Sequence, residues 1–217
     1  MLFSLMESLT TLIKEKHIPQ RDIYLAFGFD EEVGGRKGAV KIAEYFKSKG
    51  LEFDAVYDEG GIIVEKGSIS GINSDVALIG CAEKGFLSAK IKVKGLGGHS
   101  SMPPTESAIG KAAVIMQRLE DHQMKPMITP LIQEFFDNVG GAMPFTNRMA
   151  IANRWLLNPV LLSQLTKNNS TNALVRTTTA LTMMKGSDGT NVLSPEVEFV
   201  VNFRLLPGNT VKDVKDH

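Results

Sequence analysis

Apolar and polar residues follow two different periods along this chain. In the first part, apolar residues recur at helical spacing over residues 2–16 and 37–49, with a continuous apolar run at residues 23–27 between them. Such a run is typical of a strand buried on both faces of a parallel sheet. With a further short strand expected at residues 53–56, the pattern predicts a β-α-β unit with a right-handed crossover.

From about residue 84 the period changes to two. Residues 86–94 and 196–203 alternate apolar and polar side chains, which is typical of an antiparallel sheet with one exposed face. A helix is expected at residues 107–119, and Thr210 is a suitable N-cap for a last helix. We therefore predict an α/β protein in two parts, residues 1–83 with a parallel or mixed sheet and residues 84–217 with an antiparallel α+β fold.

Residues 123–172 have no long periodic element because prolines interrupt them. Short helices are expected at residues 131–136 and 155–165. We interpret this segment as an insertion of short helices that could line a substrate pocket.

Composition limits the partners. The 217 residues include 24 basic and 24 acidic side chains, so the charge gives no reason to expect nucleic acid or an anionic membrane as a partner. No apolar stretch reaches the length of a membrane span. The single cysteine, Cys81, suits a reducing compartment, and the expected location is cytoplasmic.

Carboxylates follow both expected strands of the first part. Asp30, Glu31 and Glu32 come after the first strand, and Asp58 and Glu59 after the second. Parallel strands joined by a crossover end at the same edge of the sheet, so these carboxylates are expected to lie together there. Crowded carboxylates favour binding of a divalent cation, and a carboxylate beside the cation can act as a base. The alternative is that the first group is a solvated acidic turn that caps a helix and the second an ordinary β-turn.

A loop rich in glycine and proline presents His99 directly after the strand at residues 86–94. A loop histidine of this kind is either incidental or catalytic, and its flanking glycines and serines favour the second interpretation modestly.

The order of five motifs resembles one known family, the dinuclear zinc peptidases of family M20. This family includes aminoacylases, carboxypeptidases, acetylornithine deacetylases and succinyl-diaminopimelate desuccinylases, and the chain is most similar to the branch of carboxypeptidase S and the N-fatty-acyl-amino-acid hydrolases. Residues 176–182 also resemble that branch. The motifs are Asp30-Glu31-Glu32-Val33-Gly34-Gly35, Asp58-Glu59-Gly60-Gly61, Gly97-Gly98-His99-Ser100-Ser101-Met102-Pro103-Pro104, Asn191-Val192-Leu193-Ser194-Pro195 and Asn202-Phe203-Arg204.

The resemblance implies roles in the metal centre for the acidic residues. Glu31 is expected to be the general base and Glu32 a ligand of one zinc ion. Asp58, or else Glu59, is expected to ligate the second zinc ion, with cobalt or manganese as alternative metals. Residues 1–83 then correspond to part of a catalytic domain.

The resemblance also implies roles for residues 84–217, the lid or dimerisation domain. His99 is expected to reach the active site of a partner subunit and stabilise the oxyanion there. Asn191 and Arg204 are expected to hold the substrate, with Arg204 gripping a free carboxylate. The alternative for Arg204 is a cross-strand charge on the polar face of the sheet.

Part of the family pattern is absent from this sequence. Two histidine ligands and the bridging aspartate have no counterpart, so the chain is interpreted as an internal fragment whose lid domain is incomplete at its C-terminal end. Because a two-metal mechanism needs a full ligand set, we expect weak metal binding.

The sequence therefore leaves two alternative functions. In the first, the parent protein is a zinc-dependent hydrolase of amide bonds next to a free carboxylate, acting on peptides or N-acyl amino acids as a homodimer, and the isolated chain is inactive. In the second, the chain is a non-catalytic dimerisation module, since exposed sheet edges invite pairing.

Overall fold

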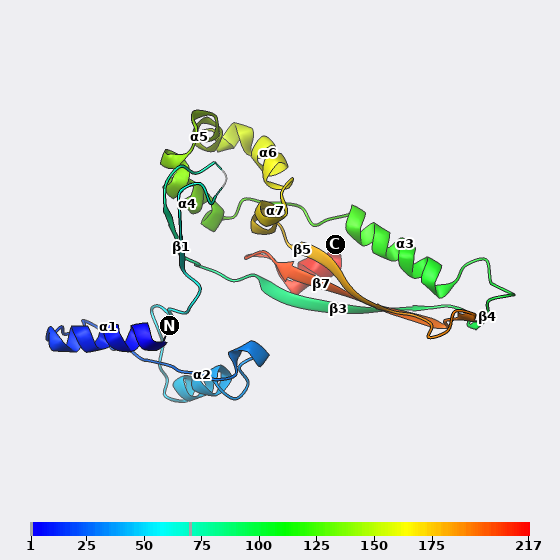
Figure 1. Cartoon of the computed structure of the whole chain (residues 1–217), viewed down its shortest axis with the longest axis horizontal. Helices are drawn as coiled ribbons and strands as arrows, with labels where there is room; N and C mark the ends of the chain where they lie inside the picture. Colours follow the sequence, from blue (N-terminus) through cyan, green and yellow to red (C-terminus); the bar gives the residue numbers. More distant parts are fainter. Residues whose placement is uncertain (1, 70) are drawn as a thin grey trace. The chain divides into compact units, whose positions relative to one another are not determined.

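The computed structural model in Figure 1 describes residues 2–69 and 71–217. The chain divides into two compact units between Gly60 and Gly61, and each unit is described by itself. Within the described residues, no helix has both the length and the apolar character that crossing a membrane requires.

In residues 2–60, the described part of the first unit, there are two helices and one 3-10 turn. They are α1 (Leu2–Lys14), η1 (Glu31–Val33) and α2 (Ala39–Ser48). Both helices form where helical spacing predicts them, but neither buries a residue. Tyr24, Phe46 and Phe53 instead make edge-to-face contacts with ring centroids 5.0 to 5.7 Å apart, and these rings hold α2 to the extended segments on either side of it.

The two strands expected in the first unit are not formed. Residues 23–27 and 53–56 have no strand assignment, and Ile23 and Phe27 are 61% and 50% exposed. A strand exists through its ladder of hydrogen bonds to a neighbour, and none of the described residues pairs with these segments. The parallel β-α-β unit that the apolar runs suggested is therefore absent from the described structure. Hairpin strands β1 (Ile62–Val64) and β2 (Val76–Leu78), which were not expected, pair instead in the second unit.

The second unit is built on a three-stranded antiparallel sheet in the order β3-β7-β5. Its strands are β3 (Gly85–Lys94), β7 (Glu196–Leu205) and β5 (Thr178–Lys185). The period-two segments form β3 and β7, as expected, and pair over their whole length. The central strand β7 alternates between buried and half-buried residues, which is the pattern of one face packed and one face exposed.

Helix α3 (Ala108–Asp121) covers one face of this sheet (Figure 1). Ser107 caps it, accepting a hydrogen bond from the Gly110 N–H at 3.0 Å. Helix and sheet approach so closely at Gly95 that a Cβ there would lie 2.9 Å from the Ala108 Cβ. The core between them contains Val93, Ala108, Ala112, Val197, Phe199, Val201, Phe203 and Leu205.

Residues 130–175 form a series of short helices. Short helices were expected in two parts of this segment, residues 131–136 and 155–165. The observed helices are α4 (Pro130–Val139), η2 (Gly140–Ala142), α5 (Phe145–Ala152), α6 (Arg154–Leu165) and α7 (Asn169–Val175). A separate small core of Ile72, Val76 and Val139 packs the β1–β2 hairpin against the end of α4. Helix α7 ends at Val175, and strand β5 begins at Thr178.

Three short elements complete the fold. Strand β4 (Gly98–His99) pairs with β6 (Val192–Leu193) beyond the ends of β3 and β7. The last helix, α8 (Val211–Asp216), starts as expected with Thr210 as N-cap, in a capping box with Asp213. The antiparallel α+β part of the predicted fold is confirmed.

Candidate functional site

The acidic turn at residues 30–35 contains one carboxylate that stabilises the turn and two carboxylates that are exposed. Asp30 accepts hydrogen bonds from the backbone N–H groups of Lys37 and Gly38, both at 2.8 Å. A Cβ at Gly38 would lie 2.6 Å from Asp30 Oδ1, so this clamp needs glycine at position 38. Asp30 therefore holds the turn closed, and Glu31 and Glu32 follow it on η1 with exposed side chains.

The acidic residues do not converge. Asp58 and Glu59 are exposed, and Asp58 Oδ1 accepts the Glu59 backbone N–H at 2.8 Å in an ordinary turn. No group of three or more His, Cys, Asp or Glu side chains that could hold a metal ion is found in residues 2–69 and 71–217. Convergence depended on two parallel strands ending on one rim, and those strands are not formed. As placed, Glu31, Glu32, Asp58 and Glu59 do not fit a zinc centre, and their individual roles stay predictions.

His99 presents one defined ring nitrogen. Its Nδ1 accepts the backbone N–H of Ser101 at 3.2 Å and lies 2.8 Å from Ser101 Oγ. A nitrogen that accepts a backbone N–H carries no proton of its own, so in the neutral ring the hydrogen is on Nε2. The exposed imidazole therefore offers an Nε2–H donor to whatever approaches the loop.

Asn191 lies next to His99. The pairing of β4 with β6 sets His99 opposite Val192, and the Ser100 N–H donates to the Asn191 carbonyl oxygen at 3.0 Å. The strands come this close because Gly97 has no side chain, and a Cβ there would lie 3.3 Å from the Leu193 carbonyl oxygen. Two of the predicted site residues, separated by more than 90 positions in sequence, are thus adjacent.

Arg204 lies at the other end of the sheet. It is exposed on β7 opposite Phe86 of β3, and its guanidinium carbon is 4.8 Å from the centre of the Phe86 ring. Eight residue steps along β3 separate Phe86 from Lys94, which corresponds to about 27 Å at the usual rise of a strand. Since His99 follows Lys94, the Arg204 and His99 of one chain are too far apart to hold one small substrate.

Lys84, beside Arg204, is a residue that the sequence interpretation missed. Its Nζ donates to the carbonyl oxygens of Ala173 and Arg176, at 2.8 and 2.7 Å, and so caps the end of α7. Burial, and then the Arg204 guanidinium, lower the pKa of Lys84 from its ordinary value. No local pattern marks such a contact, because it joins segments almost 90 residues apart.

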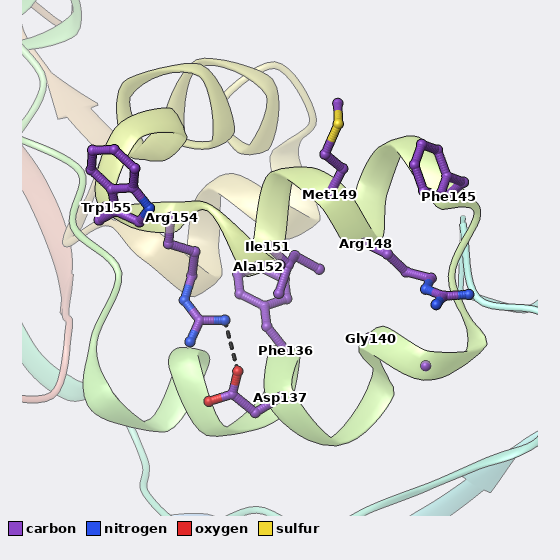
Figure 2. Close-up of a pocket in the computed structure, with 11 residues that line it drawn as sticks. Phe136, Asp137, Gly140, Phe145, Arg148, Met149, Ile151, Ala152, Arg154 and Trp155 are labelled. Atoms are coloured by element: carbon purple, nitrogen blue, oxygen red, sulfur yellow. Dashed lines mark hydrogen bonds and ion pairs between the residues drawn. The ribbon is translucent and has the colours of Figure 1, made fainter.

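The short helices enclose a groove of about 690 Å³ (Figure 2). It runs between α4 and the pair α5 and α6. Its lining residues are Phe136, Asp137, Gly140, Gly141, Phe145, Arg148, Met149, Ile151, Ala152, Arg154 and Trp155. The short helices of this insertion therefore form a groove lined mostly by apolar side chains, and its role as a substrate pocket stays a prediction.

Comparison with known families assigns most of the chain to a dimerisation domain. Residues 81–217 match the family described as the peptidase dimerisation domain of the M20 enzymes. The chain belongs to the M20 peptidase family.

Three relatives illustrate the similarity. The chain is 42% identical over 216 residues to the N-fatty-acyl-amino acid synthase/hydrolase PM20D1 of Xenopus tropicalis, covering 99% of this chain and 42% of that protein. It is 37% identical over 217 residues to the probable carboxypeptidase S-like 2 of Dictyostelium discoideum, covering 100% of this chain and 42% of the relative. It is 26% identical over 233 residues to carboxypeptidase S of Saccharomyces cerevisiae, covering 99% and 38%. The chain thus spans less than half the length of these relatives.

Proposed function

We propose that this chain is part of a hydrolase that cleaves amide bonds next to a free carboxylate, either as a carboxypeptidase or as an N-acyl-amino-acid deacylase. The relatives named above are carboxypeptidases and an N-fatty-acyl-amino acid synthase/hydrolase, which supports this substrate class. The observation that carries the proposal is the His99–Asn191 pair at the tip of the lid sheet, with a proton donor directed outward. We propose residues 1–83 as part of the catalytic domain, with a parallel or mixed sheet in the longer protein, and residues 84–217 as its lid.

Each lid residue has a proposed chemical role. The His99 Nε2–H donates to the oxyanion that forms when the amide carbonyl is attacked, and the Asn191 side-chain amide hydrogen-bonds the substrate beside it. The Arg204 guanidinium pairs with the free carboxylate. Glu31 is proposed as the base for the attacking water.

The separation of Arg204 from His99 supports an active site shared between subunits. In an N-acyl amino acid, the carboxylate is within a few bonds of the scissile amide. The two residues are about 27 Å or more apart along one sheet, so they reach one substrate only if they come from different subunits. We therefore propose that His99 and Asn191 of one subunit act with Arg204 of its partner.

Zinc is the proposed metal of the longer protein, with cobalt or manganese as alternatives, and M20 peptidases are in general metal-dependent. The ligands proposed within this chain are Glu32 and Asp58, or else Glu59. Because these side chains do not form a ligand set as placed, we derive no reaction step through the metal. A cytoplasmic location stays a prediction that the single cysteine favours.

A homodimer through the lid fits the edge strands of the sheet. Strand β3 carries Lys90, Lys92 and Lys94, and a second β3 beside it would place like charges together. Strand β5 has no charge before its last residue and exposes Met183 and Met184. We propose β5 as the edge that meets a second copy.

The hydrolase proposal is tested with a version of the chain extended at both ends, assayed with zinc on N-fatty-acyl amino acids and dipeptides. Hydrolysis is expected, and Arg204→Gln should lower kcat/KM by about tenfold to a hundredfold, the range for losing a charge-assisted pair. Substrates with an amidated carboxyl group should be insensitive to that change. Arg118→Gln, an exposed arginine on α3, is the matched control. Absence of hydrolysis by the extended protein would overturn the proposal.

The second candidate is a dimerisation module without catalysis, favoured by the exposed carboxylates that do not converge. It predicts a metal-free dimer that survives neutralisation of Glu31, Glu32 and Asp58. In both candidates, Met184→Lys should shift the chain to monomer in sedimentation velocity, while Met127→Lys, a similarly exposed residue outside the sheet, should not. A dimer unaffected by Met184→Lys would refute pairing through β5.

A further inference from the structure

The groove between α4 and the pair α5 and α6 has an apolar floor and an aromatic rim. Phe136 and Ile151 form the floor, each only 7% exposed, while Phe145 and Trp155 remain 74% and 82% exposed at the rim. Figure 2 shows Phe145 and Trp155 at opposite ends of the groove. Its volume of about 690 Å³ falls in the range of small-molecule sites. An apolar ligand lying along it would remove both ligand and groove surface from water, which is the favourable term in such binding.

The charges of the groove favour an anion. Arg154 Nη1 donates to Asp137 Oδ1 at 2.7 Å, so these two side chains neutralise each other across one end (Figure 2). Arg148, near Gly140 at the other end, forms no salt bridge with any residue that the structure describes. The lining side chains thus carry one net positive charge, and a bound monoanion would complete the pairing.

The remaining lining residues decide which amphiphile fits. Apart from the three charged residues, the lining contains no hydroxyl or amide side chain. An N-acyl amino acid has an amide next to its carboxylate. With the carboxylate on Arg148, that amide would lie away from the Trp155 indole N–H at the other end of the groove, so it would lose water without gaining a side-chain partner, which is costly. A free fatty acid has no polar group beyond its carboxylate, so it avoids this cost.

We propose that this groove binds the anion of a free long-chain fatty acid. The carboxylate pairs with the Arg148 guanidinium, and the alkyl chain lies along the floor of Phe136 and Ile151 towards Trp155. This binding is separate from the proposed hydrolysis, because the groove is formed by the short helices, whereas His99 and Arg204 lie on strands of the sheets and Asn191 lies in the turn before β6. For a deacylase of fatty-acyl amino acids, this ligand is the acyl product.

The chain supplies its own reporter for the test. Trp155 is its single tryptophan and lines the groove, so its fluorescence reports on occupancy. Titration of the chain with dodecanoate below its micelle concentration should give a saturable change. Octanoate should bind more weakly, by up to about fourfold for each of the missing methylenes. The neutral dodecanol should bind at least about tenfold more weakly than dodecanoate, because it offers no charge to Arg148.

Two variants test the assigned contacts. Arg148→Gln should weaken dodecanoate binding about tenfold or more. Because the Arg148 side chain is exposed, this variant should keep the fold, which circular dichroism checks. Arg118→Gln on α3, outside the groove, should leave binding unchanged. Ala152→Phe should fill the groove and abolish binding.

Several results would overturn the proposal. One is a folded chain whose Trp155 fluorescence does not respond to dodecanoate. A second is equal binding by wild type and Arg148→Gln. A third is binding of N-dodecanoyl glycine as tight as that of dodecanoate, which would show that the amide is accommodated. A fourth is fluorescence that follows protein concentration and not ligand, which would assign the groove to contact with a second copy of the chain.

Discussion

Replacing Thr177 by valine should destabilise the second unit although it changes the shape of the side chain very little. Thr177 is fully buried between the start of β5 and the end of β7. Its hydroxyl donates to Asn209 Oδ1 at 2.7 Å and accepts the backbone N–H of Leu206 at 2.9 Å. Valine keeps the volume and removes both bonds, so the test isolates the polar contacts from packing.

The expected cost follows from what is left unpaired. Leu206 is only 3% exposed, so its N–H stays buried without a partner, at about 1–3 kcal/mol. The bond to the half-buried Asn209 adds about 0.5–1.5 kcal/mol. Thr177→Val should therefore lower the free energy of unfolding by about 1.5–4.5 kcal/mol. Thr177→Ser keeps the hydroxyl and loses one buried methyl group, at about 1 kcal/mol.

Urea unfolding followed by circular dichroism measures both variants and a double-mutant cycle with Asn209→Ala. Asn209→Ala should cost less in the Thr177→Val background than in wild type, because its partner is already gone. A Thr177→Val chain as stable as Thr177→Ser, with an unchanged m-value, would refute the reasoning.

Three further predictions concern the turn of the acidic residues, the helix–sheet contact and α8. Gly38→Ala places a Cβ 2.6 Å from Asp30 Oδ1 and should increase amide hydrogen exchange at Lys37 and residue 38. Gly80→Ala, where a Cβ would have no neighbour within 4 Å, should leave that exchange unchanged. Equal exchange in the two variants would contradict the role of Asp30 in closing the turn. Gly95→Ala places a Cβ 2.9 Å from Ala108 and should destabilise the second unit by about 1–3 kcal/mol in urea, with Gly141→Ala as a neutral control. Hydrogen bonds from the Thr210 side chain and backbone lower the pKa of Asp213 below its ordinary 3.8, so its stabilising effect is present above pH 3.8 and is lost as the pH falls through the lower folded pKa. Asp213→Asn should therefore lower the melting temperature at pH 7 and lower it progressively less as the pH falls below 3.8, and a loss that does not change with pH would contradict this assignment.

The sheet of the second unit was largely predictable because its pattern is local. Each residue of β3 and β7 alternates with its neighbours, so the exposed and packed faces can be read from either strand alone. The apolar run at residues 23–27 has no such face and depends on neighbouring strands that the described chain does not provide. Its composition therefore indicated a strand that did not form.

The candidate site was predictable as a set of residues but not as an arrangement. The motif order identified His99, Asn191 and Arg204, yet the adjacency of the first two depends on β4 pairing with β6 across more than 90 residues. The distance of Arg204 from both follows from the antiparallel register of β3 and β7. Only the structure reveals that register, and with it the argument for a shared active site.

Subunit mixing tests this central claim most directly. In the protein extended at both ends, His99→Ala and Glu31→Gln should each abolish most hydrolysis as homodimers. Mixed dimers combine an intact Glu31 from one subunit with an intact His99 from its partner at one of the two sites. Unfolding and refolding an equal mixture should therefore restore about a quarter of wild-type activity, since half of the dimers are mixed. Mixed dimers that form, as native mass spectrometry would detect, but remain inactive would contradict an active site completed by the partner's lid.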